Sequence, residues 1–133
     1  MKFIEITTIQ EPVLNAVKEP VQITIFHVKD NVNMGNYREL IQEAQQAYQK
    51  GARNLILDLA DVRMISSAGI GGIVTIAKIF NSEAAPEPLL ANRHLRVCNC
   101  IPMMYMTFEI AGLVEVLGVC KDLQEAVASL SSE

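Results

Sequence analysis

Hydrophobic and polar residues follow two kinds of pattern along this chain, one typical of strands and the other of helices. The strand pattern consists of short runs rich in β-branched residues, such as VQITIFHV at 21–28 and NLILDL at 54–59. The helical pattern spaces apolar residues three and four positions apart, as between Tyr37 and Tyr48. Together the patterns predict strands at 2–9, 21–28, 54–59 and 94–99, a short strand or extended turn at 114–120, and helices at 33–50, 70–80, 103–113 and from Asp122 onward.

The order of these elements predicts the fold class. After the first strand, helices and strands alternate, which favours an α/β domain with a mostly parallel sheet. We therefore expect one domain over residues 1–133, with a mixed, mostly parallel sheet of four to five strands and about four helices. Half of the residues are hydrophobic, so one core can form without disulfides or metal ions. The proline-containing segment 81–92, NSEAAPEPLLAN, is expected to be a surface loop.

Local signals predict several helix ends. Asn33 or Asn36 suits the N-cap of the first helix, and Gly51 suits its end. Asp122 with Glu125 three residues later has the spacing of a capping box.

Charge and targeting signals narrow the classes of partner. The net charge of -4 and the pI near 5.2 argue against a nucleic-acid or anionic-membrane surface, which needs clustered Lys and Arg. The first residues, MKFIEITTIQE, form no signal peptide, and no apolar stretch reaches membrane-spanning length. We expect a cytoplasmic protein that is not inserted in a membrane and that binds a protein or a small ligand.

The cysteines and histidines predict no cofactor and no metal site. Cys98, Cys100 and Cys120 are an odd number of thiols in a chain without an export signal, which favours the reduced state. A zinc site needs four ligands, and His27 and His94 lack ligand spacing relative to any cysteine. His27 is interpreted as a structural or half-exposed residue. For the methionines at 103, 104 and 106, packing in the core is favoured over an exposed interaction stripe.

The turn after the central strand, ISSAGIGG at 65–72, carries the most specific signal. In an α/β sheet, functional groups tend to lie beyond the carboxyl ends of the strands, where loops meet helix N-termini. Ser66 suits the N-cap of the following helix, which makes Ser67 the first helical residue, with its hydroxyl free. Glycines at 69, 71 and 72 allow close helix packing and leave the surface around Ser67 open.

Other readings of this turn are weaker or less specific. It lacks the Lys-Ser/Thr ending of a phosphate-binding loop and the Gly-x-Ser-x-Gly pattern of a hydrolase nucleophile. No acid, base and nucleophile converge there, so we predict that the protein is not an enzyme. A purely structural role, in which Ser66 caps a helix and the glycines pack, remains open on the pattern alone.

The stretch LILDLADVRMISSAGIGGIV resembles the central motif of the STAS domain, the family of sulfate transporters and anti-sigma factor antagonists. The family pattern runs Leu-Asp-Leu-Ser-x-Val-x-x-Ile-Asp-Ser-Ser/Ala/Thr-Gly-Leu-Gly. The ending FEIAGLVEVLGVCKDLQEAVASL is similar to the short helix, short strand and final helix of that family. The resemblance extends over nearly the whole chain.

This resemblance implies a regulator of the partner-switching type. Ser67 falls on the serine that a partner kinase phosphorylates in anti-sigma factor antagonists. The unmodified domain there binds an anti-sigma factor that is itself a serine kinase, phosphorylation breaks the complex, and a PP2C-type phosphatase restores it. The partner-binding residues implied for this chain are Asn33, Ser66, Ser67, Ala68, Gly69, Ile70 and Gly71.

The chain departs from the family pattern at two positions. Ser66 replaces the acidic residue before the phosphorylated serine, and Asn33 replaces the acidic residue that opens the first helix. Both replacements can still cap helices, but two negative charges beside Ser67 are lost. An alternative within the family is a STAS module that is never phosphorylated and serves as a scaffold, for example in a transporter complex, or binds a small ligand.

Overall fold

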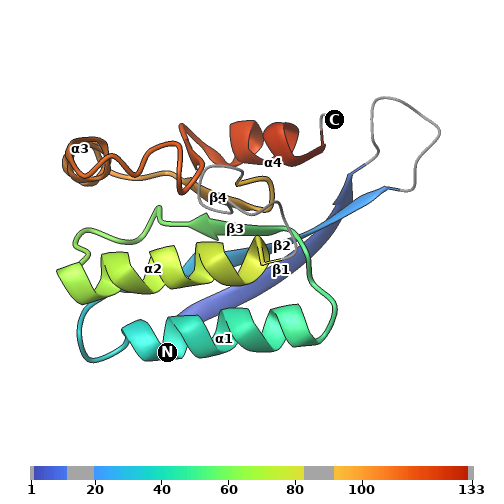
Figure 1. Cartoon of the computed structure of the whole chain (residues 1–133), viewed down its shortest axis with the longest axis horizontal. Coiled ribbons are helices and arrows are strands. Elements are labelled where there is room, and N and C mark those ends of the chain that lie inside the picture. Colours follow the sequence, from blue (N-terminus) through green and yellow to red (C-terminus); the bar gives the residue numbers. More distant parts are fainter. Residues whose placement is uncertain (1, 12–19, 83–91, 132–133) are drawn as a thin grey trace.

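The structure is a computed structural model, and it describes residues 2–11, 20–82 and 92–131. The elements, in chain order, are β1 Ile4–Glu11, β2 Val21–Val28, α1 Tyr37–Gln49, β3 Leu55–Asp58, α2 Ser67–Phe80, β4 Leu95–Cys98, α3 Pro102–Ile110, β5 Val119–Cys120 and α4 Leu123–Ser131. Figure 1 shows their arrangement around a single sheet. The predicted order of strands and helices is confirmed.

The sheet has the order β1-β2-β3-β4-β5, so each strand lies beside its neighbour in the sequence. β1 pairs antiparallel with β2, and the other three pairings are parallel. This confirms the expected mixed, mostly parallel sheet. Because β2, β3 and β4 run in the same direction, the loops that follow them meet at one end of the molecule, together with the start of α2 (Figure 1).

Helices cover both faces of the sheet. α1 and α2 pack side by side on one face, and α4 lies on the other (Figure 1). Neighbouring residues of β3 show the alternation, since Leu55 and Leu57 belong to the core under α1 and α2, whereas Ile56 belongs to the core under α4. α3 lies at the end of the molecule where α2 begins.

The predicted helix ends agree with the structure in part. Gly51 follows α1 with φ +111°, a conformation that glycine adopts without strain. Asp122 Oδ1 accepts a hydrogen bond from the Glu125 N–H at 2.9 Å, and Glu125 Oε1 accepts from the Lys121 N–H at 2.8 Å. Asn36 is the N-cap residue of α1 but makes no side-chain cap bond; its Oδ1 accepts from the Asn33 N–H instead, at 2.9 Å.

The prediction of a short strand or extended turn at 114–120 is confirmed. Most of segment 114–120 is a turn that leaves only Val119–Cys120 as a strand, because Val119 and Leu117 donate back to Val114 and Leu113. The expected loop at 81–92 lies largely outside the described residues. None of the helices in the described part of the chain combines the length and the apolar character needed to span a lipid bilayer.

Candidate functional site

Two loops are joined at the carboxyl ends of β2 and β3 (Figure 1, left). Val32, after β2, forms a parallel bridge with Ile65, after β3. The Val32 N–H donates to the Met64 carbonyl at 3.1 Å, and the Ser66 N–H donates to the Val32 carbonyl at 2.9 Å. The start of α2 is therefore held against the β2–α1 loop by backbone hydrogen bonds.

The side chain of Asn31 reinforces this junction. Its Oδ1 accepts from the backbone N–H groups of Arg63, at 2.8 Å, and Met64, at 3.0 Å. The Asn31 carbonyl in turn accepts from Asn36 Nδ2 at 2.8 Å. The loop from Asn31 to Tyr37 is expected from the sequence to contact the partner, but these bonds of Asn31 could not be predicted, because the residues that they join lie 32 and 33 positions apart along the chain.

Ser66 caps α2 as the sequence predicts. Its backbone is extended, with φ −76° and ψ 169°, and its Oγ accepts from the Gly69 N–H at 3.1 Å. The first helical bond runs from the Ile70 N–H to the Ser66 carbonyl at 2.9 Å. Ser67 is thus the first residue of α2, and it is exposed.

The first turn of α2 leaves backbone donors at the surface end of the helix. Gly69 and Ile70 donate to Ser66, whereas the N–H groups of Ser67 and Ala68 have no acceptor among the described residues. Unpaired N–H groups and the helix dipole favour negative charge at this end. The turn therefore offers a local environment in which a phosphate on the Ser67 hydroxyl is electrostatically tolerated.

Gly69 is required for the close approach of α2 to the β2–α1 loop. A Cβ atom at this position would lie 2.8 Å from Ile65 Cγ2, 2.9 Å from Val32 Cγ1 and 3.1 Å from the Val32 carbonyl oxygen. At Gly71, by contrast, a Cβ atom would meet nothing within 4 Å. The glycines of the motif thus have different roles, and only Gly69 is fixed by steric contact with the neighbouring loop.

The structure brings the predicted site residues to one end of the domain, but not all of them reach the surface. Asn33, Ser67 and Gly71 are exposed, and Ser66, Ala68 and Ile70 are half-buried. Gly69 is buried, so it shapes the turn but offers no surface to a partner protein. Asn33 Oδ1 accepts from the Gly35 N–H at 2.8 Å, which stabilises the loop beside the turn.

A match to a known protein family identifies the family of this chain. The profile of the STAS domain matches residues 15–126. The chain belongs to the STAS domain family. The match includes the β2–α1 loop, the turn that precedes α2, and helix α3. These three segments form the end of the STAS domain described above.

Individual STAS relatives agree with this assignment. The chain is 28% identical over 101 residues to BtrV of Bordetella bronchiseptica, a protein provisionally named an anti-sigma factor antagonist; the match covers 76% of this chain and 80% of BtrV. The fold is similar to that of an anti-sigma factor antagonist STAS domain protein from Planctomyces limnophilus, with a TM-score of 0.70, 16% identity and 98% of each chain covered. It is also similar to the Bacillus cell fate determinant SpoIIAA in its phosphorylated form, with a TM-score of 0.57, 15% identity, and 91% and 96% of the two chains covered.

A polar cluster in this STAS domain lies at the same strand ends but on the α4 face of the sheet. His27 and Asp58 are register partners on β2 and β3, and His27 Nδ1 lies 2.8 Å from Asp58 Oδ2. Asp58 Oδ1 accepts from Asn99 Nδ2 at 2.9 Å and from the Ala60 N–H at 3.1 Å. Burial alone would raise the pKa of Asp58, but the hydrogen bonds from Asn99, His27 and Ala60 outweigh it and lower that pKa below its ordinary value.

The interpretation of His27 as a half-exposed structural residue is consistent with this cluster. Sequence reasoning missed its acidic partner because the parallel register, and not chain proximity, brings Asp58 beside it. The cluster holds the loops after β3 and β4 together through the Asp58 to Asn99 contact. Asn99 adopts a positive φ of 62°, which asparagine tolerates better than most residues.

The methionines of α3 correct a prediction. Met104 is buried, but Met103 and Met106 are 75% and 56% exposed. The prediction that these methionines pack in the core is therefore wrong for two of the three. Apolar residues occupy both sides of this helix, and periodicity alone therefore could not separate its buried side from its exposed side. The exposed large apolar side chains at this end of the STAS domain also include Met64, directly before the motif.

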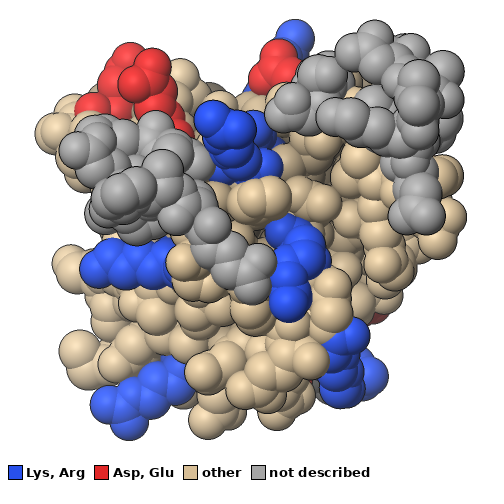
Figure 2. Space-filling model, turned by 45° about the vertical axis from the view of Figure 1, so that its right-hand side comes forward, with Lys and Arg blue, Asp and Glu red and all other residues tan. Residues whose placement is uncertain are grey.

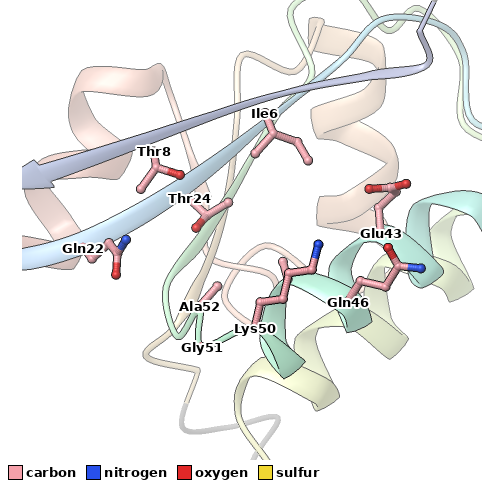
Figure 3. A pocket seen from close by; sticks show the side chains of 10 residues that line it. Ile6, Thr8, Gln22, Thr24, Glu43, Gln46, Lys50, Gly51 and Ala52 are labelled. Carbon is pink, nitrogen blue, oxygen red and sulfur yellow. The ribbon is translucent and has the colours of Figure 1, made fainter.

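Two other surfaces of the domain carry polar or charged side chains. A groove of about 440 Å³ between the sheet and α1 is lined by Thr8 and Thr24 of the strands, by Gln46 of α1 and by Lys50, which follows that helix (Figure 3). None of its lining residues belongs to the predicted site. On the face that Figure 2 brings forward, Lys and Arg form separate groups with uncharged residues between them, not one continuous stripe. Among the described residues, no cluster of three His, Cys, Asp or Glu side chains could hold a metal ion.

Proposed function

We propose that this STAS domain is an anti-sigma factor antagonist that acts by partner switching. It would bind an anti-sigma factor with serine kinase activity, and phosphorylation of Ser67 would end that binding. The observation that carries this proposal is the position of Ser67, exposed at the first residue of α2 in a turn held by Val32. It is a regulator, not an enzyme, and we place its action in the cytoplasm and its domain over residues 1–133.

A phosphate at Ser67 would change binding more than folding. It adds about −1.5 to −2 charge at neutral pH. The N–H groups of Ser67 and Ala68 lie at the positive end of α2, so the charge is tolerated within the domain. The same charge would lie within the surface that the turn and the β2–α1 loop with Asn33 form for the partner. There, desolvation of the phosphate and its repulsion of negative groups on the partner would oppose binding.

The two departures from the family pattern fit this switch. Ser66 retains the capping role through its bond to the Gly69 N–H, and Asn33 retains a loop-stabilising role through its bond to the Gly35 N–H. Neither adds negative charge beside Ser67, so neither repels a phosphate there. The local geometry of the turn is therefore kept even though the acidic residues are absent.

The relatives support the proposal at the level of the family. BtrV carries the name of an anti-sigma factor antagonist, and SpoIIAA with the same fold has been seen in a phosphorylated form. By analogy, the partners of this chain would be an anti-sigma factor serine kinase and a PP2C-type phosphatase.

Intact-mass analysis of the protein purified from its native host tests the proposal. We expect a species heavier by one phosphate in the wild type and in Ser66→Ala, and its loss in Ser67→Ala. Treatment with a PP2C-type phosphatase should remove the added mass. If no phosphate appears in any growth phase, the domain acts instead as an unmodified scaffold or ligand-binding module.

A further inference from the structure

Helix α3 is apolar on its outer side as well as its inner side. Its inner side contributes Met104 and Phe108 to the core. Three apolar side chains project from the other side: Met103, 75% exposed; Met106, 56% exposed; and Ile110, 82% exposed. They follow one another at spacings of three and four residues, so they form one stripe, which we call the α3 stripe. Thr107 and Glu109 are exposed on the same helix, so polar residues border the stripe, as is typical of apolar patches that bind other proteins.

The α3 stripe borders a groove that leads to the turn before α2. The groove has a volume of about 190 Å³ and is lined by Arg63, Met64, Ile65, Ile70, Met103, Met104, Thr107 and Phe108. This volume is below the roughly 300 to 1,000 Å³ of typical small-molecule sites. The groove therefore fits apolar side chains of a protein better than a metabolite.

The groove is continuous with the proposed phosphorylation site. Met64 and Ile65 precede the capping residue Ser66, and Ile70 lies in the first turn of α2. The groove therefore adjoins the turn that carries Ser67, although Ser67 itself is not among the residues that line it. Methionine side chains suit such a surface because they are flexible and can repack against different partners.

Charge at the groove indicates the chemistry of its occupant. Arg63 is the one charged residue among those that line the groove, and its side chain is exposed. Its guanidinium forms no ion pair with a carboxylate within residues 2–11, 20–82 and 92–131. A carboxylate on the occupant would meet this positive charge without competition from a described carboxylate.

We propose that the groove and the α3 stripe bind an amphipathic helix of the partner protein. Its apolar side chains would enter the groove between Met64 and Met103 and continue along the stripe, and an acidic residue would face Arg63. This inference rests on the proposed function for the nature of the partner. It extends the contact from the Ser67 turn, with which the groove shares Ile65 and Ile70, to α3, and so supplies apolar binding area.

The first test uses the six methionines of the chain as reporters. The full chain, labelled with ¹³C at the methionine methyl groups, is titrated with a synthetic amphipathic helix that carries leucines on one face and glutamates at its flanks. We expect shifts of the Met64, Met103 and Met106 methyl signals. A peptide with lysines in place of the glutamates should bind at least several-fold more weakly. Absence of shifts, or equal binding of the two peptides, would overturn the proposal.

The second test separates this inference from the proposed function. The serine-kinase anti-sigma factors of the host are purified and tested for binding and for phosphate transfer to Ser67. Met103→Asp and Met64→Asp should weaken binding of the kinase that modifies Ser67 by tenfold or more. Ile6→Asp is the matched control, because Ile6 is an exposed apolar residue on β1, outside the groove.

The outcomes of the second test are distinct. If Ser67 is phosphorylated and Met103→Asp binds the kinase as tightly as Ile6→Asp does, partner switching stands and the helix-docking proposal is overturned. If no kinase modifies Ser67, the proposed function fails, and the peptide titration alone then decides whether the groove binds an amphipathic helix. A molecular mass that rises with concentration in the wild type but not in Met106→Asp would show that a second copy covers the stripe, which also overturns the proposal.

Discussion

Gly69 packs directly against Val32, and this contact leaves no room for a larger residue at position 69. A Cβ atom on Gly69 would come within 2.9 Å of Val32 Cγ1 and within 3.1 Å of the Val32 carbonyl oxygen. That same carbonyl accepts the Ser66 N–H at 2.9 Å. The contact therefore determines how the start of α2, and with it Ser67, is placed against the β2–α1 loop.

Gly69→Ala is expected to destabilise the domain by about 1–3 kcal/mol, because the added methyl group forces Val32 and Ile65 to move. Gly71→Ala is the matched control, since a Cβ atom there meets nothing within 4 Å and alanine favours the helix by up to about 1 kcal/mol. Urea unfolding followed by circular dichroism measures both. Equal loss of stability in the two variants would contradict the steric role of Gly69.

Ser66→Ala is expected to lower the free energy of unfolding by about 1 kcal/mol, because the Gly69 N–H loses its side-chain acceptor. Ser67→Ala should change stability by less than about 0.5 kcal/mol, because Ser67 is exposed and its hydroxyl makes no hydrogen bond with a described group. Ser66→Asp should retain the cap, since aspartate is also a good N-cap residue. Thermal unfolding of the three variants side by side checks the order; a larger loss in Ser67→Ala than in Ser66→Ala would refute it.

Asn31→Ala is expected to loosen the junction between the two loops. The N–H groups of Arg63 and Met64 both lose their acceptor, and because both groups are at the surface we expect each lost bond to cost about 0.5–1.5 kcal/mol. Amide hydrogen exchange at these two residues should become faster. Asn33→Ala serves as the control, because the Asn33 side chain accepts only the local Gly35 N–H and should leave exchange at 63 and 64 unchanged.

Asp58 is expected to make stability depend on acid pH. Burial opposes its ionised form, but hydrogen bonds from Asn99, His27 and Ala60 outweigh burial and lower its pKa in the folded state. The folded state then binds fewer protons than the unfolded chain, so this contribution to stability is complete above the unfolded pKa, near 4, and is lost as pH falls through the lower folded pKa.

Asp58→Asn tests this dependence. At pH 7 the variant should unfold at a lower urea concentration than the wild type, because an amide replaces a carboxylate that accepts several hydrogen bonds. Below pH 4 the difference between the two proteins should shrink. A difference that stays constant from pH 7 to pH 3 would show that the ionised form of Asp58 does not contribute.

Cys100 is expected to react slowly in the folded protein. Burial raises the pKa of Cys100 to about 11, from an ordinary value of 9.0. The difference of two pH units makes the thiolate fraction at pH 8 about a hundredfold smaller than for an ordinary thiol. Burial also raises the pKa values of Cys98 and Cys120. Alkylation by iodoacetamide, followed by mass spectrometry with and without urea, should show fast modification only after unfolding; fast modification of the native protein would contradict this.

The sequence by itself determined the order of elements and the local form of the turn before α2. Strand runs, helical spacing and the Ser66 cap involve residues that are near one another along the chain, so local patterns report them directly. The central motif, which is local too, was enough for the STAS resemblance that the family match confirms.

Only the tertiary structure decided the contacts between distant segments. Asn31 reaches Arg63, and His27 reaches Asp58, because strands that run in parallel bring residues about thirty positions apart to the same end of the sheet. The exposure of Met103 and Met106 was also a tertiary outcome. Both sides of α3 are apolar, so the buried side is chosen by where the rest of the core lies, and no pattern within the helix records that choice.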